Sequence, residues 1–164
     1  MSSLVNVYWD SKLPIYEISH LKLQNEGIKS LLIDVDGTLL SRRSNIIPKR
    51  VKLWIKESKK VFSLYLISNN PSDNRIRKIA QELGIKYKSN ALKPRKTITL
   101  DVISEINEDS KNIAIIGDRI LTDVIVGNRC NIQTILVKRL NKKGLPIKFN
   151  LTLIFEKFIS SFLK

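Results

Sequence analysis

The 164-residue chain has little of what disulfide-linked, zinc-binding or membrane-spanning proteins need. Its single cysteine, Cys130, cannot form an intramolecular disulfide, and its single histidine, His20, leaves no Cys/His zinc cluster. No apolar run approaches the roughly 18 residues that indicate a transmembrane helix. Residues 1–16 lack the basic segment and apolar block of a secretory signal. We therefore expect a cytoplasmic protein with one domain over residues 1–164, and peripheral contact with the inner face of a membrane stays open.

Acidic residues are also few, with 15 Asp and Glu against 29 Lys and Arg, which gives a net charge of +14 at pH 7. Such an excess favours anionic partners: nucleic acid, an acidic membrane surface or a phosphorylated substrate. The basic residues stand in small groups, and a chain rich in Lys, Ile and Asn can equally reflect biased codon usage. The charge alone therefore leaves the partner open.

Short apolar runs alternate with amphipathic stretches between residues 31 and 138. They predict strands at 31–35, 61–67, 86–89, 112–116 and 132–137, and helices at 48–60, 73–83, 95–107 and 121–128. This alternation predicts an α/β fold in which a mostly parallel sheet lies between two layers of helices. Residues 1–30 form a polar lead-in with a short helix at 18–25, which we expect to pack against the sheet edge.

The tail at residues 146–164 differs from the core because apolar residues recur there with helical spacing from Leu151 onward. Two alternatives stay open for this amphipathic helix: it docks on its own domain, or it contacts a membrane interface or a partner. The apolar residues of the tail are Ile147, Phe149, Leu151, Ile154, Phe155, Phe158, Ile159 and Phe162.

The most informative stretch is Leu31–Leu39, where an apolar run ends in Asp34 and Asp36 and continues with Gly37 and Thr38. Side chains two apart on a strand leave by the same side, so the two carboxylates can face one crevice. Two carboxylates at such a short separation repel each other unless a cation or a shared proton lies between them. Mg²⁺ suits oxygen ligands of this kind. Taken alone, the pair can also be a solvated strand end with a turn cap.

Polar residues follow three of the predicted strands directly: Asp34, Ser68 and Asp118. In parallel sheets, ligands bind outside the carboxyl ends of the strands, near the point where the strand order reverses. The sequence therefore predicts a site at this edge of the sheet.

Four separated motifs occur in order: Asp34-x-Asp36-Gly37-Thr38, then Ser68, then Lys93-Pro94, then Gly117-Asp118-x-x-x-x-Asp123. This set resembles the haloacid dehalogenase (HAD) superfamily of aspartate-nucleophile phosphatases over about residues 31–137. The resemblance implies a HAD-like Rossmannoid three-layer sandwich and hydrolysis of phosphate monoesters through an aspartyl-phosphate intermediate. Residues 39–67 and 69–92 leave no room for a cap domain, so we expect an uncovered site.

The resemblance also implies roles for the acidic residues. Asp34 would be the nucleophile, and Asp36 would act as general acid and then as general base. Mg²⁺ would bind Asp34, the backbone carbonyl of Asp36 and Asp118. Asp123 would support the metal site without being a ligand.

Polar and cationic residues would hold the phosphate. Ser68 would donate a hydrogen bond to a phosphoryl oxygen, and Lys93 would bring a cation to the phosphate and to the nucleophile. Thr38 and Asn69 are further candidates for contact with the substrate. Taken singly, Ser68 can be a turn residue and Lys93 a solvated loop residue.

The lead-in and the last motif resemble one branch more closely, the phosphatidylglycerophosphate phosphatase-like group within HAD subfamily IIIA. The shared residues are Pro14, Ile15, Ile18, Leu21, Gly27-Ile28-Lys29 and Gly117-Asp118-Arg119-x-Leu121-Thr122-Asp123. The resemblance implies conversion of phosphatidylglycerophosphate to phosphatidylglycerol. The chain departs from this branch at Arg119, where Gln is common.

Two other functions stay open at this level. One is a HAD phosphatase that acts on a small sugar or nucleotide phosphate, with oligomerisation covering the site. The other is a non-catalytic nucleic-acid-binding module that uses the positive charge. The second lacks a recognisable RNA- or DNA-binding motif.

Overall fold

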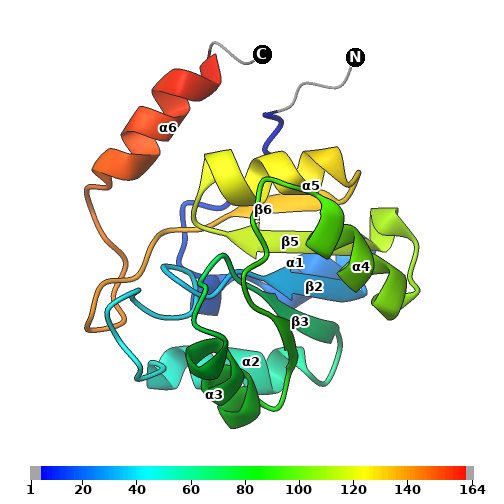
Figure 1. Cartoon of the computed structure of the whole chain (residues 1–164), viewed down its shortest axis with the longest axis horizontal. Coiled ribbons are helices and arrows are strands. Elements are labelled where there is room, and N and C mark those ends of the chain that lie inside the picture. The colour runs from blue at the N-terminus through cyan, green and yellow to red at the C-terminus, as the bar shows by residue number, and fades with distance from the viewer. Residues whose placement is uncertain (1–4, 162–164) are drawn as a thin grey trace.

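The computed structural model describes residues 5–161. Residues 1–4 and 162–164 lie outside this part, and with them Phe162 of the predicted terminal helix. A six-stranded sheet forms the centre, with the strand order β1-β6-β5-β2-β3-β4 and parallel pairing between all neighbours (Figure 1). The strands are β1 Trp9–Asp10, β2 Ser30–Ile33, β3 Ser63–Ile67, β4 Lys86–Lys88, β5 Ile113–Gly117 and β6 Gln133–Leu136. The predicted α/β class is confirmed, and the sheet is parallel throughout.

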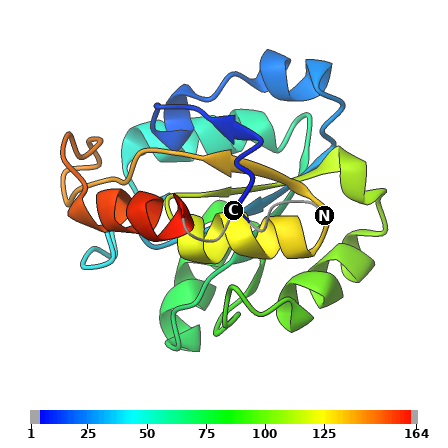
Figure 2. The same ribbon diagram turned by 90° about the horizontal axis from the view of Figure 1, so that it is seen from above.

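Helices cover both faces of the sheet. Figure 2 shows α1 and α2 on one side and α5 on the other. The helices are α1 His20–Asn25, α2 Lys49–Ser58, α3 Asp73–Leu83, α4 Thr97–Ile106, α5 Ile125–Arg129 and α6 Leu151–Ser161, and the π-helical turn Ile120–Val124 leads into α5. The predicted elements of the core therefore occur in the predicted order. Their ends differ from the prediction by at most two residues, except that α5 begins four residues later, after the π-helical turn.

The burial of β2 on both faces of the sheet explains why its sequence is one continuous apolar run. Leu31 and Ile33 belong to the cluster that contains the buried residues of α1, α2 and α3, whereas Leu32 packs with residues of α4 and α5. A strand of a parallel sheet is buried on both faces, so both of its alternating positions must be apolar.

The strand order also determines where ligands can bind. The chain runs from β2 outward through β3 to β4, and then returns to place β5 on the other side of β2. The connections therefore diverge above the carboxyl ends of β2 and β5, which is the place where open parallel sheets bind ligands.

Only part of the lead-in was predicted. Ile15, Ile18 and Leu23 are buried in the same cluster as the residues of α2, and Trp54 Nε1 of that helix donates a hydrogen bond to the carbonyl of Ile18 at 2.9 Å. The two-residue edge strand β1 was not predicted, because two residues are too short for a periodic pattern. It pairs with β6.

Residues 39–93 contain α2 and α3 and no further helix, and every residue in that range is described.

The only tail element in the described residues is α6, which both views place beside the turn that leads into α5 (Figures 1 and 2). Within residues 5–161, no helix combines the length and the apolar character that crossing a bilayer requires.

Candidate active site

The three residues at the strand ends meet at one edge of the sheet, as predicted. Asp34 follows β2, Ser68 follows β3 and Asp118 follows β5. Because these strands are neighbours, their ends are spaced by about 4.8 Å, the separation of hydrogen-bonded strands. A pocket of about 560 Å³ opens above them, and its lining includes Asp34, Asp36, Gly37, Ser68, Asn69 and Lys93.

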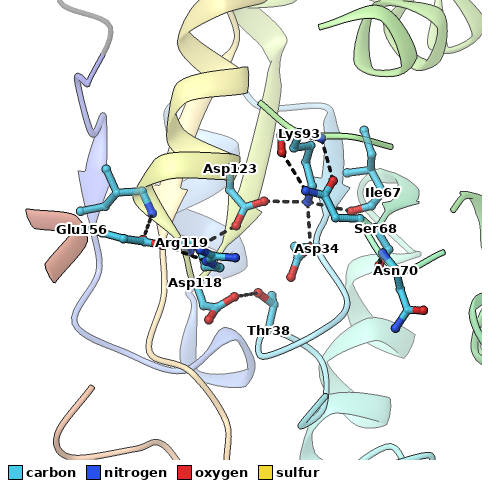
Figure 3. A network of polar contacts seen from close by, with 12 residues as sticks. Asp34, Thr38, Ile67, Ser68, Asn70, Lys93, Asp118, Arg119, Asp123 and Glu156 are labelled. Atoms are coloured by element: carbon cyan, nitrogen blue, oxygen red, sulfur yellow. Dashed lines mark hydrogen bonds and ion pairs between the residues drawn. The ribbon is translucent and has the colours of Figure 1, made fainter. Parts of the chain in front are cut away.

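Lys93 forms the centre of the pocket floor (Figure 3). Its Nζ donates hydrogen bonds to Asp34 Oδ1 at 2.8 Å, to Asp123 Oδ1 at 2.6 Å and to the carbonyl of Ile67 at 2.9 Å, so all three ammonium protons have partners. Burial disfavours the charged form, but Asp123 and Asp34 outweigh it and raise the pKa of Lys93. The side chain therefore stays a fixed cation beside Asp34.

Three buried carboxylates gather around this lysine. Oxygens of Asp34, Asp118 and Asp123 lie within 4.8 Å of one another. Burial raises the pKa of Asp34 to about 8, since the opposing effect of Lys93 is countered by the charges of Asp123 and Asp118. Burial likewise raises the pKa of Asp118 to about 6, against the effect of Arg139. The raised pKa values reflect negative charge that is unfavourable in this buried cluster without a counter-charge. A hard divalent cation such as Mg²⁺, which prefers oxygen ligands, would supply that counter-charge.

The oxygens of the three acids differ in their hydrogen-bond donors. Both oxygens of Asp123 have donors: Oδ1 accepts from Lys93, and Oδ2 accepts from the backbone N–H of Arg119 at 3.2 Å. Asp118 is bound by Arg139, and its Oδ1 accepts a hydrogen bond from Thr38 Oγ1 at 3.5 Å. Both oxygens of Asp118 and of Asp123 therefore have donors, whereas Asp34 is bonded by Lys93 at Oδ1, and the supporting role of Asp123 stays a prediction.

Two glycines make this close gathering possible. Gly37 has a φ of 101°, and a Cβ added to it would lie 2.7 Å from Asp118 Oδ2. A Cβ on Gly117 would lie 2.2 Å from Asp123 Cγ. Any larger residue at either position would push a carboxylate out of the cluster.

Asp36 lies apart from the cluster, at the rim of the pocket. Asn70 Nδ2 donates a hydrogen bond to its Oδ2 at 2.7 Å, and Arg75 Nη1 lies 2.8 Å from its Oδ1 as an ion pair. Arg75 comes from α3 and also donates to Asn45 Oδ1 at 3.1 Å and to the carbonyl of Ser44 at 2.9 Å. One guanidinium thus joins Asp36 to the loop that follows the first motif.

The predicted substrate-contacting residues have different surroundings. Ser68 is buried in the pocket wall, and its Oγ accepts a hydrogen bond from the backbone N–H of Asn70 at 3.1 Å. Asn69 binds the main chain of Lys93 twice, accepting from its N–H at 2.7 Å and donating to its carbonyl at 2.8 Å. Thr38 is fully buried beneath Asp118. Asn69 and Thr38 therefore support the floor, and their contact with a substrate stays a prediction.

Several cations of the pocket were not singled out from the sequence. Arg139 follows β6 and pairs with Asp118, while Arg42, Arg43 and Lys142 line the mouth. Arg119 also lines the pocket, and its Nε donates to Glu156 of α6 at 2.8 Å. A pocket with this many cations favours an anionic ligand.

Comparison with known proteins agrees with this geometry. Residues 91–144 match the family model described as HAD-hydrolase-like. The chain is 30% identical over 138 residues to the probable phosphatase YqeG of Bacillus subtilis, an alignment that covers 83% of this chain and 80% of that protein. It is 26% identical over 133 residues to phosphatidylglycerophosphate phosphatase 1, chloroplastic/mitochondrial, of Arabidopsis thaliana, covering 76% of this chain and 38% of that protein.

Solved structures share the fold. The cobalt-bound deoxy-D-mannose-octulosonate 8-phosphate phosphatase of Haemophilus influenzae superposes with a TM-score of 0.55 at 22% identity, over 67% of this chain and 66% of that one. The magnesium-bound HAD-hydrolase YfnB of Bacillus subtilis has a TM-score of 0.55 at 13% identity, over 73% and 90%. With the YqeG alignment and the family model, the carboxylate cluster at the strand ends identifies this chain as a phosphatase that belongs to the HAD-like superfamily.

Proposed function

We propose that the protein is a Mg²⁺-dependent phosphate monoester hydrolase of HAD subfamily IIIA that converts phosphatidylglycerophosphate to phosphatidylglycerol at a membrane surface. The observation that carries the chemistry is the position of Asp34, whose Oδ1 is held by Lys93 at the floor of a cation-lined pocket. The lipid substrate is supported by the similarity to the Arabidopsis enzyme and by the shared lead-in residues.

Asp34 is the nucleophile in this proposal. Because Lys93 binds Oδ1, the other oxygen is the one that attacks the phosphorus atom. An O–P bond forms to Asp34 as the P–O bond to the substrate alcohol breaks. Lys93 and Ser68 stabilise the charge on the phosphoryl oxygens. When bound by Asp34, Asp118 and the carbonyl of Asp36, Mg²⁺ would reduce the repulsion between nucleophile and phosphate.

Asp36 moves the protons. It gives its proton to the leaving alkoxide in the first step and, now a carboxylate, takes one from the water that attacks the aspartyl-phosphate in the second. That second step releases phosphate and restores Asp34. Asn70 and Arg75 hold Asp36 at the rim, where a leaving group can reach it.

A side-by-side rate comparison tests the substrate. Hydrolysis of phosphatidylglycerophosphate in mixed detergent micelles with Mg²⁺ is measured against soluble sugar and nucleotide monophosphates. We expect at least a tenfold preference in kcat/KM for the lipid. A preference for a soluble phosphate would leave the assignment as a phosphatase intact but refute the lipid substrate. It would favour the alternative of a small sugar or nucleotide phosphate.

A further inference from the structure

The helix α6 docks on the protein with its polar side inward. Glu156 is 1% exposed and Ser160 is also buried, whereas Ile154 is 49% and Phe155 is 62% exposed. A helix that docks on its own core normally buries the apolar stripe and exposes the charges. Of the two alternatives that the sequence left open, the helix therefore packs on the protein, but it leaves its apolar side unburied.

Polar contacts fix this orientation. Both oxygens of Glu156 are engaged: Oε1 accepts from Arg119 Nε and Oε2 accepts from the backbone N–H of Ile120, each at 2.8 Å (Figure 3). Leu153 adds one apolar contact, against the cluster that contains Ile120 and Val124. Rotating the helix to bury its phenylalanines would strip a buried carboxylate of its partners, which is strongly unfavourable.

The exposed apolar residues continue toward the pocket. We define the outward face of α6 by Leu151, Ile154 and Phe155 of the helix together with Phe149, two residues before it, all of them exposed. Thr152, on the same helix, and Ile147, just before it, both line the pocket. The outward face therefore begins beside the pocket mouth.

Charge indicates what covers this face. The segment 138–148, which leads into α6, carries five basic residues and no acidic one: Lys138, Arg139, Lys142, Lys143 and Lys148. Arg42 and Arg43 add two more cations at the pocket mouth. Apolar residues beside a basic strip match the anionic headgroups and acyl chains of a bilayer surface. A second copy of the chain would bring the two basic strips against each other.

We propose that the outward face of α6 and the basic segment 138–148 form a docking surface for an anionic lipid bilayer. This surface turns the pocket mouth toward the headgroups, and its biological use rests on the proposed function. Glu156 and Arg119 then join the membrane-contacting helix to the loop that carries Asp118.

Vesicle co-sedimentation of the full chain tests the surface without any need for hydrolysis. Vesicles of phosphatidylglycerol and phosphatidylcholine are compared with pure phosphatidylcholine vesicles, at low and at high salt. We expect binding to the anionic vesicles, weakened by salt, and at least tenfold weaker binding for the double variant Ile154→Ser/Phe155→Ser. The matched control is Leu53→Ser, at a position 54% exposed on α2, which should bind like the parent protein. Circular dichroism checks that each variant is folded.

Three outcomes would overturn the proposal: no binding to anionic vesicles at low salt, equal binding to neutral ones, or a dimer in light scattering that the double variant abolishes. The two proposals can fail separately. Vesicle binding without hydrolysis of phosphatidylglycerophosphate would leave the docking surface and refute the lipid substrate. Hydrolysis of phosphatidylglycerophosphate in micelles without vesicle binding would leave the lipid substrate and refute the docking surface.

Discussion

The two acids of the first motif are separated by one residue, Val35, and occupy opposite kinds of environment. Asp34 belongs to a floor built by strand ends, where Lys93 and two further carboxylates surround it. Asp36 belongs to a rim built by loops and a helix, where Asn70 and Arg75 hold it. The floor concentrates negative charge, whereas the rim orients one carboxylate, which exchanges protons in the proposed mechanism. Each region can be perturbed separately.

The largest effect should follow from replacing Asp34, the proposed nucleophile on the floor. Asp34→Asn keeps the shape of the side chain and removes the attacking oxygen, so Mg²⁺-dependent hydrolysis of an aryl phosphate should fall by more than about 10⁴-fold, as for other covalent nucleophiles. Steady-state kinetics measures the loss, and circular dichroism checks the fold. Retained activity would remove Asp34 from the mechanism.

The corresponding change at the rim should cost less. Asp36→Asn removes the proposed general acid and base but leaves the floor intact, so kcat should fall by about 10²–10⁴-fold, the usual contribution of such a group. The loss should be smaller for substrates with a good leaving group, because these need no proton. A loss independent of the leaving group would argue against the acid role.

A milder change tests whether the rim depends on orientation. Arg75→Met removes the ion pair to Asp36 and both contacts to the loop, and should lower kcat by about 10–100-fold, the usual cost of losing a supporting contact. KM should stay within about twofold, a split that general destabilisation would not produce. Arg77→Met is the matched control, because Arg77 lies on the same helix and donates a hydrogen bond to Asn74 Oδ1 at 3.1 Å instead of binding Asp36. Equal losses in the two variants would contradict the assignment.

The smallest effect concerns stability. Burial raises the pKa of Asp34 from 3.8 to about 8, so between these values the folded protein binds a proton that the unfolded chain does not. Stability must therefore fall as the pH rises through this window. In EDTA, Tm should drop by several degrees between about pH 5 and pH 8. Asp34→Asn should flatten this decline.

Added Mg²⁺ should restore Tm at the higher pH, because the cation replaces the proton. A Tm that rises with pH in EDTA, for the parent and the variant alike, would show that other groups dominate.

The floor could be predicted from the sequence because the sheet creates it. Once the apolar runs are assigned to parallel strands, Asp34, Ser68 and Asp118 must meet at one edge. Lys93 needed the order of motifs as well, since its loop has no periodic signal. The floor therefore follows from periodicity and order.

The rim could not be predicted in the same way. Arg75 lies on an amphipathic helix and looks like any solvated arginine, and Asn70 looks like a turn residue. Arg139 follows the last strand of the core, among other basic residues. Their roles depend on contacts between segments distant in sequence, which local patterns do not record.

The sequence of the tail predicted its helix but not the orientation of that helix. Helical spacing predicted α6, but the rule that apolar stripes face inward would give the wrong orientation here. The deciding fact is the pair of contacts that Glu156 makes with Arg119 and Ile120, 37 and 36 residues away. The sequence pattern of the helix alone does not predict these contacts.

The central position of β2 has a consequence for synthesis on the ribosome. One edge of β2 pairs with β3, which follows soon after, but the other waits for β5, at residues 113–117. Until then the nascent chain carries an apolar strand with a bare edge, the kind of surface that recruits unwanted partners. The same delay keeps Asp34 away from Asp118 and Asp123, so the growing chain cannot assemble this carboxylate cluster until synthesis has passed Asp123.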